Sequence, residues 1–281
     1  MARVKPEQSP VDYVVVDSLL RALERSETQD AEGNRDGLTH PNRQGPNMLT
    51  GNPIGVLGGM GPEATVLLQR KLIDAVPAHD DRDHIPLLID MNSKVPSRIA
   101  HLIEGTGEDP GPTLAAMARR LESAGAVALA MPCNTAHYYA PAIVEAVNIP
   151  LLNMVELAAD RALALLGVGG VVGMLASPAV RRTRLFENAL EGRGLRAVWP
   201  KDDASILAAI RAIKVMGPCD AAQQAMLAAS EELAVAGAAL QFVACSEFSL
   251  IADSVATDVH AVDTVDLLTS AITDFHAAIE S

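Results

Sequence analysis

The residues best suited to chemistry in this sequence are two cysteines, Cys133 and Cys245, each at the end of an apolar run. The first is followed by the polar pair Asn-Thr and the second by the pair Ser-Glu. A single free cysteine is usually a small buried hydrophobe. A thiol beside a helix N-terminus is different, because unpaired N–H groups and the helix dipole favour its thiolate. Two cysteines in this context predict a pair of nucleophiles or bases.

An internal repeat places the two cysteines in equivalent positions. Residues 121–136, LESAGAVALAMPCNTA, match residues 233–248, LAVAGAALQFVACSEF, at one constant offset. The run IGVLG at 54–58 likewise resembles VGMLA at 172–176, and each is the expected first strand of its half. Ligands of open α/β sheets bind at the carboxyl ends of the parallel strands. We therefore expect the two thiols to face each other across a cleft.

Facing thiols favour proton transfer over disulfide exchange. Redox cysteines usually form a close C-x-x-C pair, whereas Cys133 and Cys245 lie far apart in the sequence. If one thiolate removes a proton from a carbon and the opposite thiol returns a proton to the other face, the configuration inverts. This chemistry is racemisation without a cofactor. Cys219, in the loop MGPCDAA, lacks the same context and is interpreted as incidental.

The elements that must position these residues alternate regularly from Pro53 onward. Apolar runs such as IGVLGG and IPLLIDM alternate with Ala- and Leu-rich helical stretches, including a long one over about 203–237. This rhythm is typical of parallel sheets covered by helices. We predict an α/β fold of two pseudosymmetric Rossmann-like domains with parallel sheets and the active site in the cleft between them. The first domain is predicted over 53–155 plus 262–281, and the second over 156–261.

The first 52 residues differ from the rest. Residues 11–26 suit one short helix, but residues 26–47 are polar, rich in Gly, Asn and Asp, and without periodicity. We predict a disordered N-terminal tail over 1–52. Met48 lies just before the first ordered pattern, so the functional chain is expected to begin near it.

Composition narrows the class of protein. The chain has 281 residues, of which 49% are hydrophobic and 20% charged, enough apolar material for α/β domains. Its net charge of −13 argues against a nucleic-acid partner, which needs a concentrated basic surface. No apolar run approaches the roughly 20 residues of a membrane span, and no signal-peptide pattern opens the chain. Three cysteines suit free thiols in a reducing compartment. We expect a cytoplasmic protein that acts on a small molecule without a membrane partner.

Four segments carry a resemblance to a known family: GVLGGMGPEAT (55–65), NSKVPSR (92–98), PCNTAHYY (132–139) and ACSE (244–247). They resemble the aspartate/glutamate racemase superfamily, nearest its aspartate racemase branch, and the resemblance covers roughly residues 53–281. The last segment is a looser version of the family's usual Gly-Cys-Thr-Glu. The resemblance implies a pyridoxal-independent amino-acid racemase with no cofactor, usually a homodimer. It also implies that Cys133 and Cys245 act as paired acid and base on aspartate or glutamate.

The resemblance further implies a set of substrate-binding residues. Asn134, Thr135 and Ser246 match residues that bind the substrate carboxylate or amino group in the family, and Arg98 matches an arginine that clamps a side-chain carboxylate. Glu247 is expected either to orient or protonate the second thiol, or simply to occupy the first turn of a helix. The complete predicted set is Met60, Asn92, Arg98, Asn134, Thr135, Ser177, Ser246 and Glu247.

Two departures from the family bear on the substrate. The family loop commonly reads Pro-Asp-Arg, whereas here it is Pro-Ser-Arg and ends at Arg98. Family members that act on acidic amino acids often carry a second cation near the helix after the Trp199-Pro200 strand. At that place the sequence offers Lys201 followed by two aspartates. This weakens the case for an acidic substrate and leaves another amino acid open.

A dinucleotide site is the first alternative. Residues 59–64 match G-x-G-x-x-A after a strand, and Asp90 ends the next strand. However, Glu63 would oppose a pyrophosphate at the same helix end. A tight strand-to-helix turn therefore explains the glycines better, and in the racemase interpretation this turn lines the cleft.

Metal and pyridoxal chemistry fit less well. Cys133 and His137 would supply two metal ligands, but no further Cys or His has the spacing of a complete set, so no metal is predicted. Lys94 is the lysine expected nearest the site, and no phosphate cup for pyridoxal accompanies it. Two alternatives remain open: a one-thiol isomerase or decarboxylase of the same fold, and a non-catalytic protein that binds a small molecule.

Overall fold

The computed structural model of the chain describes residues 51–280. The predicted helix over 11–26, the predicted start near Met48 and all but the last two residues of the predicted tail lie outside the described residues. Where the described chain begins, Asn52 Nδ2 donates to Glu280 Oε1 (2.9 Å). The start of the described chain therefore lies beside its end.

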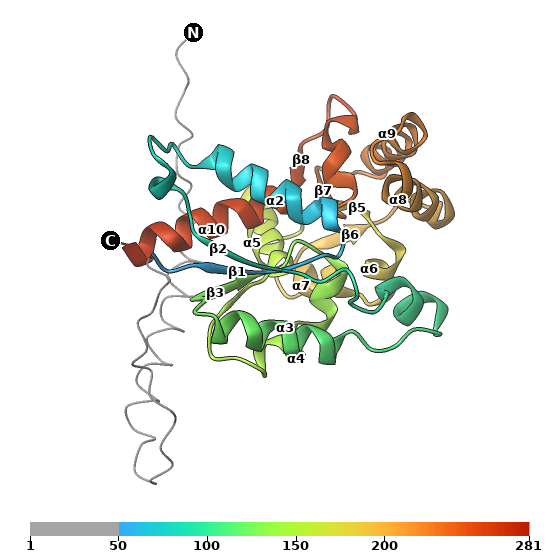
Figure 1. Cartoon of the computed structure of the whole chain (residues 1–281). Helices are drawn as coiled ribbons and strands as arrows, with labels where there is room; N and C mark the ends of the chain where they lie inside the picture. Colours follow the sequence, from blue (N-terminus) through green and yellow to red (C-terminus); the bar gives the residue numbers. More distant parts are fainter. Residues whose placement is uncertain (1–50, 281) are drawn as a thin grey trace.

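Two four-stranded parallel sheets form the framework (Figure 1). The first has the order β2-β1-β3-β4 and the second the order β6-β5-β7-β8. All strand pairs in both sheets are parallel. The predicted α/β fold with two parallel-sheet halves is confirmed. The strands are β1 (Ile54–Gly58), β2 (Leu87–Met91), β3 (Ala128–Ala130), β4 (Leu151–Leu152), β5 (Val171–Ala176), β6 (Arg196–Val198), β7 (Leu240–Ala244) and β8 (Ala261–Asp263).

The internal repeat is reproduced in the strand register. Ile54 of β1 pairs with Ala128 of β3, and Val172 of β5 pairs with Leu240 of β7. These pairs occupy equivalent places in the two aligned segments of the sequence. The two halves are therefore similar in how their strands are paired as well as in the order of their strands.

A glycine in the first strand of each half lets the helix and turn that lead into the neighbouring strand, β3 or β7, pack closely. A β-carbon added to Gly55 would come within 2.9–3.1 Å of three side chains, and one added to Gly173 within 3.0–3.2 Å of three others. The contacted residues are Leu121, Ala126 and Leu129 in the first half and Leu233, Ala238 and Gln241 in the second. The three contacted residues occupy the same positions of the repeat in both halves. The same close approach therefore requires glycine at position 55 and at position 173.

Helices cover both faces of the first sheet (Figure 1). Alternate residues of β1 explain why: Ile54 and Val56 pack with α2 and α10, whereas Leu57 packs with α3. A strand whose side chains alternate between two apolar layers must be buried on both faces. The helices are α2 (Pro62–Ala75) and α10 (Thr264–Glu280) on one side and α3 (Gly111–Ser123) and α4 (Ala140–Val144) on the other.

The second sheet has two layers of helices as well. One core combines Val172 and Met174 of β5 with α5 (Met154–Leu166) and α7 (Leu185–Glu191). The other combines Leu175 with α8 (Asp203–Met216) and α9 (Asp220–Val235). The predicted helical stretch over 203–237 is thus two helices, because Gly217 adopts φ +74 and ends the first. The short α6 (Pro178–Arg182) follows β5.

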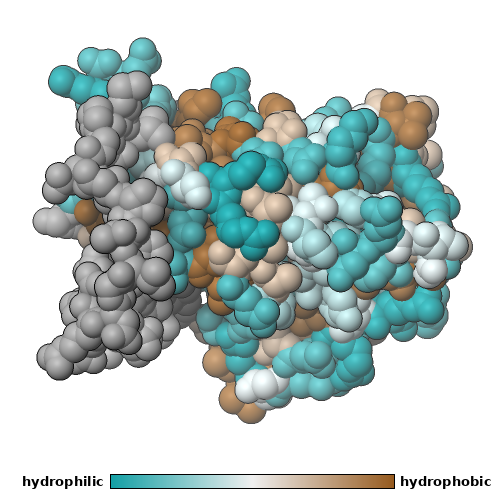
Figure 2. Space-filling view, turned by 60° about the horizontal axis from the view of Figure 1, so that its bottom comes forward, coloured by the Kyte–Doolittle hydropathy of each residue, from teal (hydrophilic) through white to brown (hydrophobic). Residues whose placement is uncertain are grey.

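The chain crosses between the halves at α5 and again at α10. Strand β8 pairs with β7 up to Asp263, two residues beyond the predicted domain boundary, and α10 then packs on the first sheet. The predicted domain bounds stay a prediction. On the face that Figure 2 shows, hydrophilic residues predominate and the hydrophobic residues of the described chain form small, separate groups. Over residues 51–280, no helix combines the length and apolar character that a membrane span requires.

Candidate active site

A cavity is lined by segments that follow strands of both sheets. The position agrees with the rule that ligands of α/β sheets bind beyond the carboxyl ends of the strands. The lining residues are Met60, Ser97, Arg98, Ile99, Cys133 and Thr135 from the first half and Ser177, Ile210, Lys214, Cys245 and Glu247 from the second.

Both predicted cysteines line this cavity. Cys133 follows β3, Cys245 follows β7, and both are free and buried, each with 6% of its surface exposed. After each thiol the chain turns into a 3₁₀ helix, η3 (Thr135–Tyr139) or η4 (Phe248–Ser254). Two equivalent strand ends therefore bring one thiol from each half to a shared space.

The Cys245 thiol belongs to a chain of polar contacts. Its Sγ donates to Glu247 Oε2 (3.2 Å), and Lys214 Nζ donates to Glu247 Oε1 (2.8 Å). Burial raises the pKa of the Cys245 thiol, and the charge of Glu247 raises this pKa further, to well above its usual value. Burial alone would lower the pKa of Lys214, but Glu247 outweighs it and the pKa is raised. Cys245 therefore rests as a protonated thiol beside a carboxylate that is paired with an ammonium group.

The Cys133 turn is held differently, by His137. This ring is 2% exposed; its Nδ1 lies 2.9 Å from Cys133 O, and its Nε2 accepts from Met154 N (3.1 Å), the first residue of α5. Burial lowers the pKa of His137 to about 4, so the ring is neutral and Nδ1–H is the donor. Both ring nitrogens are thus used to fix the thiol-bearing turn. Within residues 51–280, no group of three or more His, Cys, Asp or Glu side chains has a metal-binding arrangement.

Arg98 supplies a cation to the same cavity. Its Nη1 donates to Pro96 O (3.1 Å), and none of the ion pairs found in the described part of the chain engages its guanidinium. A guanidinium without a carboxylate partner is suited to bind an anionic group of a ligand.

The second cation of the cavity wall is Lys214 rather than Lys201. Lys201 lies at the surface and pairs with Glu232 (3.7 Å), whereas Lys214 on α8 lines the cavity. Lys94 is exposed and is not among the lining residues, so it is not the lysine nearest the site. Lys214 lies on α8 one helical turn after the buried Ile210 and lines the cavity, although 38% of its side chain is exposed. That i, i+4 spacing was the signal that would have found it.

Seven of the ten predicted site residues line the cavity, and three do not. The lining residues are Met60, Arg98, Cys133, Thr135, Ser177, Cys245 and Glu247. Asn92 Oδ1 accepts from Lys94 N (2.9 Å), Asn134 Nδ2 donates to Thr264 Oγ1 (2.9 Å), and Ser246 is buried away from the lining. The sequence did not single out Ser97, Ile99, Ile210 or Lys214. Ser97 and Ile99 flank Arg98, so the loop motif that indicated Arg98 could also have indicated these two residues.

The glycine motif over 59–64 has a packing role. Gly59 adopts φ +89, and a β-carbon there would come within 2.4 Å of the backbone of Asn92. A β-carbon added to Gly61 would lie 3.6 Å from the carboxylate of Glu247, which would repel a phosphate. Asp90, the residue proposed to bind a ribose, pairs with Arg120 (2.6 Å). The dinucleotide alternative therefore loses its sequence support.

The fold and the cavity define a class: a pseudosymmetric α/β protein of two halves, each of which contributes one thiol to a shared site. Residues 57–272 match the family model described as Asp/Glu/Hydantoin racemase, and the chain belongs to this family. The predicted family and the predicted enzyme class, an isomerase of the amino-acid racemase type, are confirmed.

Several known proteins are similar over most of the chain. The broad specificity amino-acid racemase RacX of Bacillus subtilis (strain 168) is 25% identical over 236 residues, which cover 81% of this chain and 100% of that protein. The structure of Picrophilus torridus aspartate racemase has a TM-score of 0.67 and 26% identity, over 80% of this chain and 94% of that one. A glutamate racemase from Francisella tularensis, solved in complex with D-glutamate, has a TM-score of 0.57 and 18% identity, over 83% and 82% of the two chains. This last likeness bears on the fold alone.

Proposed function

We propose that the protein racemises an amino acid by a two-base mechanism in which Cys133 and Cys245 are the acid and the base. The observation that carries this proposal is the presence of one buried thiol from each half in the wall of a single cavity. No pyridoxal is required, because both proton transfers are assigned to side chains of the chain itself.

The proton balance is as follows. A thiolate on one side takes the α-proton and leaves an electron pair on the α-carbon, delocalised into the carboxylate. The thiol on the other side then gives its proton to the opposite face, and the configuration is inverted. At the end the first sulfur carries a proton and the second is a thiolate, so the reverse reaction starts from the mirror-image protonation state. Hydrogen-bond donors aimed at the developing negative charge lower the barrier.

The contacts of Glu247 and Lys214 support a resting state in which the two thiols differ in protonation. Cys245 donates its proton toward Glu247 and rests as the acid, which suits the enantiomer whose α-proton faces Cys133. For the other enantiomer, Cys245 must first become a thiolate. Glu247 is placed to accept its proton, since Cys245 Sγ donates to one carboxylate oxygen and Lys214 pairs with the other. We assign Glu247 as the base that converts Cys245 from thiol to thiolate.

We propose aspartate or glutamate as the substrate. Arg98 is the anchor for one carboxylate, and Lys214 supplies a second cation to the cavity wall. The aspartate racemase activity of the Picrophilus torridus protein agrees with this choice. A second candidate is a neutral amino acid, since Glu247 already neutralises Lys214 and since Met60, Ile99 and Ile210 give the wall an apolar part. The broad specificity of the Bacillus subtilis relative agrees with that candidate.

The test is racemisation in deuterated water without added cofactor, on a panel of single enantiomers that includes aspartate, glutamate and neutral amino acids. In early turnover, deuterium should enter mainly the product of opposite configuration. Cys133→Ala and Cys245→Ala should each abolish racemisation, whereas Cys219→Ala, the matched control, should leave it intact. The surviving thiolate can exchange the α-hydrogen of only the enantiomer whose proton faces it, so the two inactive variants should exchange opposite enantiomers. Full racemisation in either variant would contradict the mechanism.

A protein that binds the panel without racemising it would support the non-catalytic alternative, and carbon dioxide release would support a decarboxylase. The proposal includes the homodimer and the cytoplasmic location, which the family resemblance and the composition support. Sedimentation equilibrium of the purified chain tests the first of these, and cell fractionation tests the second.

A further inference from the structure

One buried hydroxyl joins the two thiol-bearing segments. Asn134, which directly follows Cys133, donates from Nδ2 to Thr264 Oγ1 (2.9 Å). Thr264 Oγ1 in turn donates to the carbonyl oxygen of Val243 (3.1 Å), two residues before Cys245. Thr264 is the first residue of α10, the helix that returns from the second sheet to the first. This path from one thiol to the other therefore passes through two side chains, those of Asn134 and Thr264.

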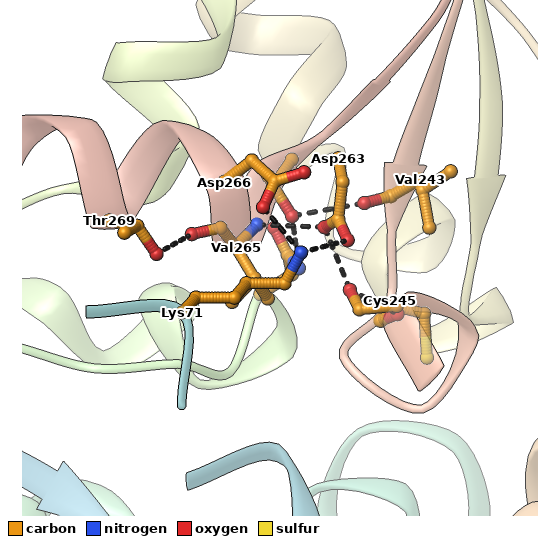
Figure 3. Close-up of polar contacts among 10 residues, drawn as sticks. Lys71, Val243, Cys245, Asp263, Val265, Asp266 and Thr269 are labelled. Carbon is orange, nitrogen blue, oxygen red and sulfur yellow. Dashed lines mark hydrogen bonds and ion pairs between the residues drawn. The ribbon is translucent and has the colours of Figure 1, made fainter. Parts of the chain in front are cut away.

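The start of α10 is itself fixed to both halves (Figure 3). Asp263 Oδ1 accepts from Val265 N (2.8 Å) and from Ser249 Oγ (2.8 Å), and the same Ser249 Oγ lies 3.5 Å from Cys245 O. On the opposite side Lys71 of α2 pairs with Asp266, and its Nζ lies 4.0 Å from Asp263 Oδ2. These contacts hold the helix start in place relative to both sheets.

Burial makes the bridge selective for a hydroxyl. Thr264 is 0% exposed and Asn134 is 2% exposed. A hydroxyl can accept one hydrogen bond and donate another at the same time, which no apolar side chain of the same shape can do. Without it, the Asn134 amide and the Val243 carbonyl would both lose a partner in a place that water does not reach. The Asn134 Nδ2 serves this bridge, whereas its buried Oδ1 has no hydrogen-bond partner among the described residues.

We propose that Thr264 is a positioning residue that sets the separation and mutual orientation of Cys133 and Cys245. This inference rests on the proposed two-thiol function, because only that mechanism requires both sulfurs to flank one carbon atom. Proton transfer from two opposite sides depends on alignment, and a displacement of about 1 Å is enough to slow such a reaction on the order of 100-fold. Loss of the bridge should therefore reduce turnover while substrate binding at the anion anchor continues.

Three variants separate this role from ordinary core stability. Thr264→Val keeps the shape and removes the hydroxyl, and Thr264→Ser restores the hydroxyl. Thr269→Val is the matched control, because the Thr269 hydroxyl is also buried on α10 but donates only to Val265 O of its own helix (2.8 Å). We expect kcat to fall about 100-fold in Thr264→Val with little change in KM. The Ser variant and the control should retain most of the turnover.

A second readout does not require racemase activity. Iodoacetamide labelling, followed by mass spectrometry, should become about tenfold faster at Cys133 in Thr264→Val, as expected when one buried hydrogen bond no longer holds its turn closed. Cys219 is the internal reference, and Thr269→Val should not show the change. If the wild type fails to racemise any amino acid, the proposed function fails, and labelling still decides whether the bridge positions the thiol.

Two results would overturn the proposal. One is a Thr264→Val variant whose kcat and labelling match those of Thr269→Val. The other is a loss in Thr264→Val that Thr264→Ser does not recover. If Thr264→Val does not fold, Asn134→Ala removes the other end of the same bridge and must show the same fall in kcat and the same faster labelling. A rise in KM alone in that variant would instead assign Asn134 to substrate binding and refute the bridge.

Discussion

The ionisation of His137 provides a test of how the Cys133 turn is held. The neutral ring donates to Cys133 O and accepts from Met154 N, whereas a protonated ring has no acceptor for the second bond. His137→Gln removes the titrating group and leaves an amide in its place. At pH 7.5 we expect this variant to be less stable than the wild type by about 2 kcal/mol, the order of two hydrogen bonds.

The pH dependence follows from the pKa values. Burial lowers the pKa of His137 from 6.5 to about 4, so the unfolded chain binds more protons than the native one between these values. The contribution of His137 is therefore fully present above pH 6.5 and is lost as the pH falls toward 4. The loss amounts to about 3 kcal/mol in full and about 2.5 kcal/mol between pH 7.5 and 4.5. The stability difference between wild type and variant should shrink to near zero over that range.

Asp263 opposes this trend in the wild type. Burial raises the pKa of its carboxyl from 3.8 to about 6, so here the native state binds more protons than the unfolded chain between these values. Asp263 therefore costs stability at neutral pH, and this cost is relieved as the pH falls through 6, by about 2 kcal/mol at pH 4.5. The pH-dependent contributions of His137 and Asp263 to the free energy of unfolding therefore largely cancel. Either contribution is visible only when the other residue is replaced.

Urea unfolding of the wild type and His137→Gln at several pH values between 4.5 and 7.5 measures the difference directly. Carboxyl groups common to both proteins drop out of that difference. The exposed His79 provides the control, since His79→Gln should follow the wild type at every pH. Asp263→Asn should lose stability on acidification more steeply than the wild type. A constant difference between wild type and His137→Gln across the range would refute a neutral, doubly bonded His137.

Two further predictions concern the cavity. Arg98→Ala should raise the KM for aspartate or glutamate about 10- to 100-fold, because one charge-assisted contact is lost. Arg98→Lys should retain part of the affinity. An unchanged KM in the Ala variant would show that another residue anchors the carboxylate. Glu247→Gln should lower kcat/KM about 100-fold, equally in both directions, because the amide has no place for the Cys245 proton. Chiral chromatography of initial rates measures this effect, with the surface change Glu232→Gln as control, and an unaffected rate would remove Glu247 from the mechanism.

Much of the fold was predictable because short apolar runs and the repeat constrain it strongly. Residues 54–58 and 172–176 were expected to be equivalent first strands, and they occupy equivalent positions in their sheets. The break between α8 and α9 falls in the segment MGPCDAA, which was expected to be a loop and in which Gly217 is followed by proline, a pair that usually ends a helix.

The site was less predictable than the fold, because its polar partners are distant in sequence. Motifs indicated both thiols and Arg98, and all three line the cavity. The Lys214–Glu247 pair depends on how α8 packs beside the turn after β7, which no local spacing encodes. The Asn134–Thr264 bond likewise joins residues of different sheets, so the sequence offered only the family role for Asn134.

The repeat also localises the chemical difference between the two thiols. His137 and Ser249 are equivalent positions, and each contacts the carbonyl oxygen of its own cysteine and the start of the helix after the fourth strand of its half. The backbone support of the two thiols is therefore similar. Two residues after each cysteine the halves diverge, since the first has a threonine and the second has Glu247, paired with Lys214. Because the framework is shared, the charge of Glu247 at this repeat position, added to the effect of burial, distinguishes the Cys245 thiol by raising its pKa. In the proposed mechanism this difference decides which thiol serves first as the acid.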